Sequence, residues 1–305
     1  MSSPFGPMRL IVNPRAGRHE ADLKALTDGL AAQGLDFDEV RTTGPGSAER
    51  LAREALEEGI RYLVAVGGDG TVHEVVNGMV ADDKPVNPDA VLGVYAAGSG
   101  CDFIRTFGLN RAPDVVARHF ATDHVMPIDV GVAELTGPDG RPLQRYFANI
   151  AEVGYGAEAV RRAAGYPRWL GKVRYLFAAW GAVRGVNAQQ ATIELEGKQV
   201  DRNLVNLVAA NCQFFGGGMK VAPRALPDDG IFNVQIFHGA KSQVFQLTSK
   251  IYKGEHIPHP GISEFQSPWV AVAPDEPMLV EADGEVLGTT PVRFRLLQRA
   301  IQLKL

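Results

Sequence analysis

The chain has 305 residues, of which 45% are hydrophobic and 22% charged, and its formal net charge is −4. This composition is that of a globular protein with a core of normal size, and it provides no global basic field, so no nucleic-acid partner is expected. The two cysteines, Cys101 and Cys212, form no CxxC pattern, which argues against a disulfide framework or a cysteine-rich zinc site.

No targeting signal is recognisable in the sequence. The N-terminal residues contain no basic region followed by an apolar signal core, and no apolar run approaches the ~18–20 residues that a membrane span needs. A cytoplasmic location is therefore expected, with at most transient association with a membrane surface. The residue pattern does not indicate an oligomeric state, so a homo-oligomer stays open.

The first part of the chain alternates between strand and helix patterns. Short apolar runs predict buried strands, and apolar residues at i, i+3, i+4 and i+7 predict amphipathic helices. This alternation indicates an α/β domain over residues 1–127, with a parallel sheet whose glycine-rich turns share the rim at which ligands bind. The predicted strands are residues 9–12, 37–40, 62–66 and 90–95, and the predicted helices begin near residues 23, 48 and 72.

After about residue 127, strand patterns follow one another with little helix between them. They predict a second, β-rich domain over residues 128–290, built as a sandwich of antiparallel sheets. One exception is residues 171–184, where apolar residues have helical spacing. The predicted strands are residues 128–135, 145–153, 191–197, 203–212, 231–237 and 269–274, followed by a last strand from residue 292.

The turn "GGDGT" at residues 67–71 joins a buried strand to a helix. Backbone N–H groups in such a turn, together with the helix N-terminus, are suited to binding phosphate. Asp69 would repel a phosphate unless a divalent cation or a catalytic water lay between them. A tight turn in which Asp69 bonds its own backbone is the alternative. The turn lacks the G-x-G-x-x-G dinucleotide fingerprint, and "GKV" at residues 171–173 lacks the hydroxyl of a Walker A loop.

Segments along nearly the whole chain resemble, in order, the motifs of the diacylglycerol kinase catalytic-domain family, which includes bacterial lipid kinases and sphingosine and ceramide kinases. The resemblance implies an NAD kinase/diacylglycerol kinase-like fold, with residues 291–305 returning toward the first domain. It also implies an ATP- and Mg²⁺-dependent lipid kinase. The segments are "IVNPRAG" (11–17), Thr42, "GGDGTVHEVVNG" (67–78), "GSGCDFIRTFGL" (98–109), "GGGMKVAPRALPDDGIFNV" (216–234) and "ADGE" (282–285).

The resemblance also assigns roles to individual residues. Glu285 matches the family's proton acceptor, and Asp69 and Asp102 match acids that serve the catalytic magnesium and its water network. Asp129 matches an acid that contacts the lipid head group in sphingosine kinases. A structural magnesium would be bound by the carbonyl oxygens of Leu226 and Ile231 and the side chain of Asp229. The ATP site would be lined by Asn13, Pro14, Arg15, Ala16, Gly17, Thr42, Gly67, Gly68, Asp69, Gly70, Thr71, Val72, His73, Glu74 and Ser99.

Structural alternatives exist for three of these acids. Glu285 follows Asp-Gly, a common hairpin pair, and would then be a solvated acid. Asp129 would then bond backbone amides at the domain junction, and Asp229 would belong to an ordinary Asp-Gly turn.

Three residues depart from the family's pattern. Ala96, Ser99 and Cys101 stand where the family has Pro, Thr and Asn, and a thiol is only a weak donor in place of an amide. A catalytically silent lipid- or nucleotide-binding module therefore stays open. An NAD kinase-like enzyme is a second alternative, disfavoured by the segments at 98–109, 216–234 and 282–285.

The sequence leaves the acceptor lipid open among diacylglycerol-type lipids, phosphatidylglycerol, ceramides and sphingoid bases. Residues 161–184 combine six basic residues with four Tyr and Trp residues, which suits peripheral contact with the membrane that holds the lipid substrate. A helix that packs its apolar face on the sandwich is the alternative for this stretch.

Overall fold

The computed structural model describes residues 3–16, 20–97, 101–166, 178, 181–182 and 185–305. The chain forms two compact units, one of Met1–Asp129 with Leu297–Leu305 and one of Val130–Leu296. It passes between them within two long strands, β7 (Val125–Thr136) and β17 (Glu285–Lys304). Within the described ranges, no helix is long and apolar enough to cross a membrane.

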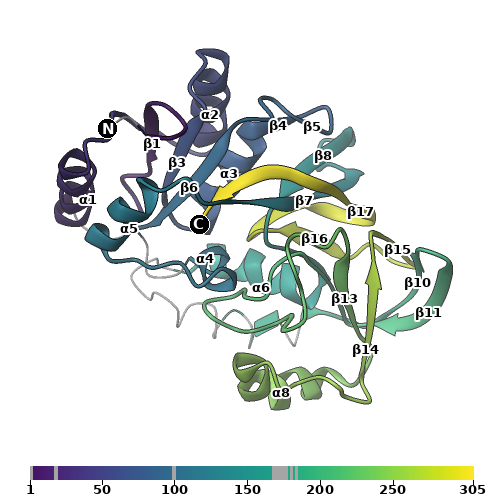
Figure 1. Ribbon diagram of the computed structural model, residues 1–305. Coiled ribbons are helices and arrows are strands. Elements are labelled where there is room, and N and C mark those ends of the chain that lie inside the picture. Colours follow the sequence, from purple (N-terminus) through teal and green to yellow (C-terminus); the bar gives the residue numbers. More distant parts are fainter. Residues whose placement is uncertain (1–2, 17–19, 98–100, 167–177, 179–180, 183–184) are drawn as a thin grey trace. The chain divides into compact units, whose positions relative to one another are not determined.

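The first unit is built on a parallel sheet with helices on both faces, as the alternation predicts (Figure 1). Every residue of two of its strands, Tyr62–Gly67 and Val91–Ala96, is buried, which is typical of a parallel sheet covered on both sides. The strands and helices are β1 (Met8–Val12), α1 (Glu20–Ala32), β2 (Phe37–Arg41), α2 (Ser47–Glu57), β3 (Tyr62–Gly67), α3 (Asp69–Met79), β4 (Val80–Ala81), β5 (Lys84–Pro85), β6 (Val91–Ala96), α4 (Phe103–Thr106) and α5 (Pro113–Phe120).

The strand order in this unit is β2-β1-β3-β6, and the last residues of β17 pair parallel to β6. Leu26 of α1 and Phe120 of α5 join Leu10 and Val64 in one core, which places these helices on one face. Helices α2 and α3 pack against each other and against β1 and β3. At Gly78 an added Cβ would lie 2.6 Å from the Cβ of Ala52, so glycine permits the close approach of α2 and α3.

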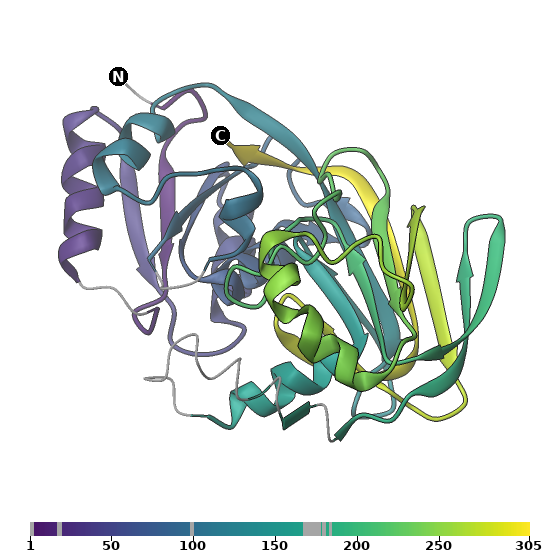
Figure 2. The same ribbon diagram turned by 90° about the horizontal axis from the view of Figure 1, so that it is seen from below.

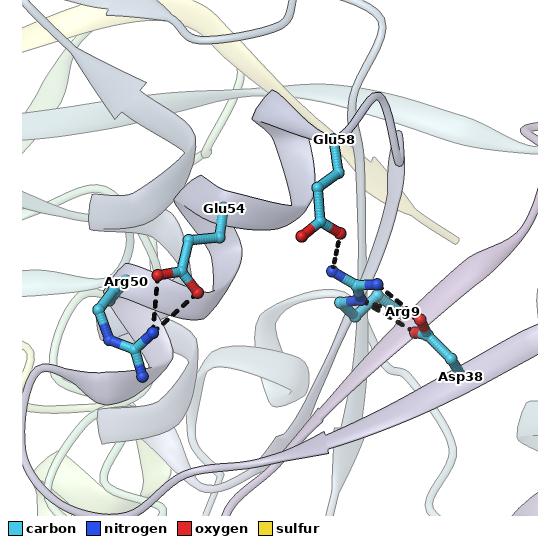
Figure 3. Close-up of polar contacts among 5 residues, drawn as sticks. All are labelled: Arg9, Asp38, Arg50, Glu54 and Glu58. Carbon is cyan, nitrogen blue, oxygen red and sulfur yellow. Dashed lines mark hydrogen bonds and ion pairs between the residues drawn. The ribbon is translucent and has the colours of Figure 1, made fainter.

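Arg9 of β1 forms an ion-pair network beside the sheet (Figure 3). Its Nε and Nη2 donate to the carboxylate of Asp38 on β2, and its Nη1 donates to Glu58 just after α2. The hydrogen bond to Asp38 is the main cause of the raised pKa of Arg9. The network ties two strands to the end of a helix, whereas the exposed Arg50–Glu54 pair in the same view lies within α2 alone.

The second unit is a sandwich of antiparallel strands. One layer has the order β14-β13-β12-β9-β16-β17 and the other the order β8-β7-β17-β15-β10-β11, so β17 belongs to both. The elements are β8 (Pro142–Phe147), β9 (Ile150–Gly154), α6 (Tyr155–Ala164), β10 (Gln189–Leu195), β11 (Lys198–Leu204), β12 (Asn206–Ala210), β13 (Phe232–Phe237), α8 (Lys241–Lys253), β14 (Ile262–Ser267), β15 (Trp269–Pro274) and β16 (Leu279–Ala282).

The core of the second unit lies between the two layers. Phe147 is at its centre, with its ring stacked 5.8 Å from that of Phe232 and edge-on at 6.0 Å to that of Phe294. Val153 and Ile193 join the same core from opposite layers. The β-rich sandwich predicted for this part of the chain is therefore confirmed.

Three details of the second unit differ from the prediction. Residues 145–153 form two strands, because the N–H groups of Ala148 and Asn149 donate to the side chain of Asp283 and not to a neighbouring strand. Residues 203–212 likewise divide into β11 and β12. The prediction that this unit contains little helix is also wrong, since α6 and α8 cover the outer face of the β9 layer (Figure 2). Leu247 and Ile251 of α8 pack against this face. The helix predicted over 171–184 lies mostly outside the described residues.

Candidate active site

The carboxyl ends of the parallel strands bring several predicted segments to one rim of the first unit. Val12 at the end of β1 is beside Val66 of β3, and Gly67 is beside Ala96 of β6. The N–H of Thr42 donates to the carbonyl of Val12 at 2.9 Å, so the turn after β2 joins the same rim. This rim carries the described part of the predicted ATP site, while Gly17 and Ser99 lie outside the described residues.

A hydrogen bond between Asn13 and Thr71 links the first glycine-containing turn to the start of α3. Asn13 Nδ2 donates to Thr71 Oγ1 at 3.1 Å, and Asn13 Oδ1 accepts the N–H of Arg15 at 3.0 Å. At Gly67 an added Cβ would lie 2.2 Å from Thr71 Oγ1, so glycine is needed for the threonine to fold back over the strand end. At Gly70, by contrast, no described atom lies within 4 Å of an added Cβ.

Asp69 binds the backbone of a segment more than thirty residues further along the chain. Its Oδ1 accepts the N–H of Asp102 at 2.8 Å and the N–H of Phe103 at 3.0 Å. The Asp102 side chain is 4% exposed, and its Oδ1 lies 3.1 Å from Nε of Arg105. The two acids predicted to serve the catalytic magnesium therefore belong to one connected cluster at the start of α4.

Cys101 lies beside this cluster and is completely buried. Burial is the main cause of the raised pKa of its thiol, and the charge of Asp69 raises it further. The thiol therefore stays protonated at neutral pH and is a poor nucleophile. Its role in the folded chain is that of a small apolar side chain with a weak S–H donor.

Glu74 caps the helix that precedes it in sequence. Its Oε1 accepts the N–H of Gly46 at 3.0 Å, and its Oε2 accepts the N–H of Ala48 at 2.9 Å, both at the start of α2. A carboxylate is favoured there because it meets unpaired N–H groups and the positive end of the helix dipole. The neighbouring Val72 and His73 are buried. The predicted ATP contacts of these three residues stay predictions, and Glu74 has a structural contact in addition.

Asp283 in the second unit has a role that the sequence analysis missed. Its Oδ1 accepts the N–H groups of Asn149 at 3.0 Å and Ile150 at 3.1 Å, and its Oδ2 accepts the N–H of Ala148 at 2.9 Å. Asp283 has φ 50° and Gly284 has φ 88°, a left-handed turn that these two residue types tolerate best. The turn that precedes Glu285 is thus fixed by three hydrogen bonds.

Glu285, the predicted proton acceptor, begins β17 and has a side chain that is 40% exposed. Its Oε2 lies 3.7 Å from Nη2 of Arg145 on β8, and the Arg145 side chain is 19% exposed. Arg145 gave no signal in the sequence, because the two residues are brought together only by strand pairing. The ion pair orients the Glu285 carboxylate and leaves it accessible.

Asp129 is completely buried, and its Oδ1 accepts the N–H of Arg299 at 2.7 Å. Arg299 has φ 51°, so the carboxylate holds an irregular position of β17. This is the backbone contact that the structural alternative expected. The predicted contact with a lipid head group stays a prediction.

The predicted structural magnesium site is an Asp-Gly turn. Oδ1 of Asp229 accepts the N–H of Ile231 at 3.1 Å, and Leu226 is 51% exposed. One carboxylate with two main-chain carbonyls is a set of hard oxygen ligands that fits Mg²⁺ when waters complete the shell. Across the described part of the chain, however, no three His, Cys, Asp or Glu side chains are grouped to hold a metal ion.

Comparisons with known proteins agree with this architecture. The family model for the diacylglycerol kinase catalytic domain matches residues 7–133, and the model for the YegS C-terminal NAD kinase beta sandwich-like domain matches residues 149–305. The chain is 28% identical to "Diacylglycerol kinase" of Bacillus subtilis, a match that covers 97% of this chain and 95% of the relative. It is 32% identical to "Probable lipid kinase YegS-like" of Chromohalobacter salexigens, with 93% of each chain covered.

A crystal structure of a diacylglycerol kinase from Bacillus anthracis has the same fold, with a TM-score of 0.74 at 21% identity. The match covers 99% of this chain and 97% of that one.

Proposed function

The chain belongs to the diacylglycerol kinase catalytic-domain family and is a lipid kinase, and on that premise we propose that it transfers the γ-phosphate of ATP to a lipid hydroxyl with the help of Mg²⁺. The observation that carries this proposal is the cluster at the rim of the parallel sheet. There, Asp69 is held by the amides of Asp102 and Phe103 beside a glycine-rich turn at the start of a helix.

The glycine-rich turn would bind the phosphates of ATP, the phosphoryl donor. Gly70 leaves its backbone accessible among the described residues, and the first turn of α3 supplies N–H groups suited to phosphate oxygens. Asn13 fixes the hydroxyl of Thr71 beside them. Asp69 and Asp102 are the acids that would serve Mg²⁺. Asp69 would do so through a water molecule, because its carboxylate already accepts N–H groups. The ion, when bound, neutralises charge on the transferring phosphoryl group.

Glu285 would act on the lipid hydroxyl, the phosphoryl acceptor. Its carboxylate would take the proton of the lipid hydroxyl as the hydroxyl oxygen forms a bond to the γ-phosphorus and the bond to the β–γ bridging oxygen breaks, releasing ADP. Asp283 fixes the turn before Glu285, and Arg145 orients its carboxylate. In-line transfer requires the hydroxyl, the base and the γ-phosphorus to come together in the reacting complex.

A diacylglycerol-type lipid is the first acceptor to test, because a relative that matches 97% of this chain is named diacylglycerol kinase. Phosphatidylglycerol, ceramides and sphingoid bases are the other candidates.

Three further proposals concern binding. The substrate would be met at a membrane surface, Asp129 would contact the lipid head group, and Asp229 with the carbonyls of Leu226 and Ile231 would form a structural Mg²⁺ site. The basic and aromatic stretch invoked for membrane contact lies largely outside the described residues.

The decisive experiment supplies the purified chain with [γ-³²P]ATP and Mg²⁺, separate vesicles of each lipid class, and NAD. We expect label on a lipid, dependent on Mg²⁺, and a loss of most of it in Asp69→Asn. Label on NAD would show an NAD kinase-like enzyme. No labelled product despite ATP binding would show a catalytically silent module. Either of these results would overturn the proposed function.

A further inference from the structure

Two buried glutamates in the second unit have no part in the reaction described above. Glu281 of β16 is directly opposite Glu152 of β9 in the antiparallel register. Directly opposite residues point to the same face of a sheet, with Cβ atoms about 4.5–5.5 Å apart. Their strand neighbours, including Val153 and Ala282, point into the sandwich core. The two glutamates therefore point to the other face, which α6 covers.

The hydrogen bonds of this pair are incomplete. Glu281 is 0% exposed, its Oε2 accepts the N–H of Gly284 at 2.8 Å, and its Oε1 is buried without a hydrogen-bond partner among the described residues. Glu152 is 6% exposed, and its Oε1 accepts Asn206 Nδ2 at 3.0 Å. At Gly156 an added Cβ would lie 2.0 Å from Glu152 Oε2, so α6 presses directly on this carboxyl group.

Among the described residues, the surroundings of the pair provide no compensating cation. The charged and titratable groups that act on it are Asp283 in the following turn and the Tyr155 hydroxyl on α6. Further along α6, Glu158 is engaged by Arg161 and Arg162. In the described part of the chain, no lysine or arginine forms an ion pair with Glu152 or Glu281.

Two adjacent negative charges in such a site would be strongly unfavourable. Burial raises the pKa of Glu152 to about 7, and burial together with Glu152 raises the pKa of Glu281 well above its usual range. Two carboxyl groups coupled in this way titrate as a pair, and the pair binds a proton up to a pH well above the pKa of an isolated glutamate.

We propose that Glu152 and Glu281 share a proton, and that Glu281 in this state is a positioning residue that holds the turn before Glu285 through the N–H of Gly284. The effect on catalysis rests on the proposed function, in which Glu285 is the base. Loss of the shared proton would set two negative charges against each other, displace Glu281 and release the turn. The catalytic rate would then fall at alkaline pH, while ATP binding in the other unit would not change.

The test compares Glu281→Gln with Glu281→Leu. The glutamine keeps an oxygen for the Gly284 N–H and cannot titrate. We expect wild-type hydrogen-exchange protection of the Gly284 amide, kcat at neutral pH within about threefold of wild type, and no alkaline decline of kcat. The leucine has no acceptor, so we expect exchange of Gly284 about tenfold faster or more and kcat about tenfold lower, with the KM for ATP unchanged.

Two controls keep the proposal falsifiable. Glu285→Gln tests the base directly: if it keeps wild-type turnover, the proposed base is wrong, while the exchange rate of Gly284 still decides whether Glu281 holds the turn. Circular dichroism checks that Glu281→Leu is folded, and if it is not, the pH profile of Glu281→Gln decides. The proposal is overturned if Gly284 exchanges in folded Glu281→Leu as it does in wild type, or if Glu281→Gln keeps the alkaline decline.

Discussion

The two units each contain an Asp-Gly turn in which the aspartate binds the backbone of a distant segment. Asp69 in the first unit accepts N–H groups from Asp102 and Phe103, and Asp283 in the second accepts three N–H groups from residues 148–150. The backbone differs between them. Asp69 is the first residue of a helix, after an extended Gly68, whereas Asp283 has a left-handed φ of 50°.

The difference shows how one short motif supports two kinds of chemistry. In both turns the glycine after the aspartate has no described atom within 4 Å of an added Cβ, so the backbone is accessible at Gly70 and Gly284. In the first unit the fixed acid is itself the predicted magnesium acid. In the second unit the fixed acid, Asp283, is structural, and Glu285, two residues further along the chain, carries the exposed carboxylate. Substitutions at the two kinds of acid should therefore separate catalysis from stability.

Glu285→Gln gives the largest expected effect in this comparison. The substitution keeps the shape of the side chain but removes the proton acceptor, so kcat should fall by about 10²–10⁴-fold. The ATP dissociation constant and the melting temperature should not change, because Asp283 still fixes the turn. Steady-state kinetics on lipid vesicles and calorimetric ATP titration measure these quantities. Arg145→Gln is the matched control, with a smaller loss, and wild-type turnover in Glu285→Gln would contradict the assignment.

Asp283→Ala should chiefly affect stability. It removes three hydrogen bonds from a buried carboxylate and places alanine at a left-handed φ, which should lower the free energy of unfolding by about 3 kcal/mol or more. Asp283→Asn is the control, since asparagine tolerates this conformation and keeps one acceptor oxygen. Urea denaturation compares the variants. Equal stability of Asp283→Ala and wild type would show that the turn is held by other contacts.

The buried glutamates add a pH dependence to the stability of the second unit. The folded chain keeps the Glu152 proton up to about pH 7, whereas the unfolded chain loses it near the ordinary glutamate pKa of 4.5. The folded state therefore binds more protons between these values, and its stability should fall as the pH rises through them. Glu152→Gln should remove this fall, a difference on the order of 3 kcal/mol at slightly alkaline pH. Parallel stability curves for the two proteins would refute the raised pKa.

Cys101→Asn should have the smallest effect. Asparagine is the residue that the family resemblance places here, beside the acid cluster, so turnover should stay within about threefold of wild type or rise. Its amide enters a fully buried position, and a stability cost of about 1 kcal/mol is expected where one of its polar groups is unpaired. Kinetics and thermal denaturation of the purified variant measure both effects. A large loss of turnover would mean that the site depends on the thiol.

Sequence patterns alone predicted the architecture of both units and the place of the glycine-rich turn at residues 67–71. Apolar periodicity is a local property, and it correctly indicated strands β1, β3 and β6, with their carboxyl ends predicted to within one residue, and hence the rim where their turns lie. It also indicated the β-rich second unit. It did not indicate α8. The apolar residues of this helix are buried by packing on the sheet face that contains Val208 and Phe237, and this contact is not encoded in the local sequence pattern.

The pairing of polar side chains depends on tertiary contacts that the sequence patterns did not indicate. In "FANIAEVG", Glu152 is the single charged residue of a mostly apolar segment, and it is buried because α6 covers its face and β16 places Glu281 opposite it. The same holds for Arg145 with Glu285 and for Asp283 with the amides of residues 148–150. These partners are separated by more than a hundred residues. They are brought together by the register of strand pairing, which a local sequence pattern does not determine.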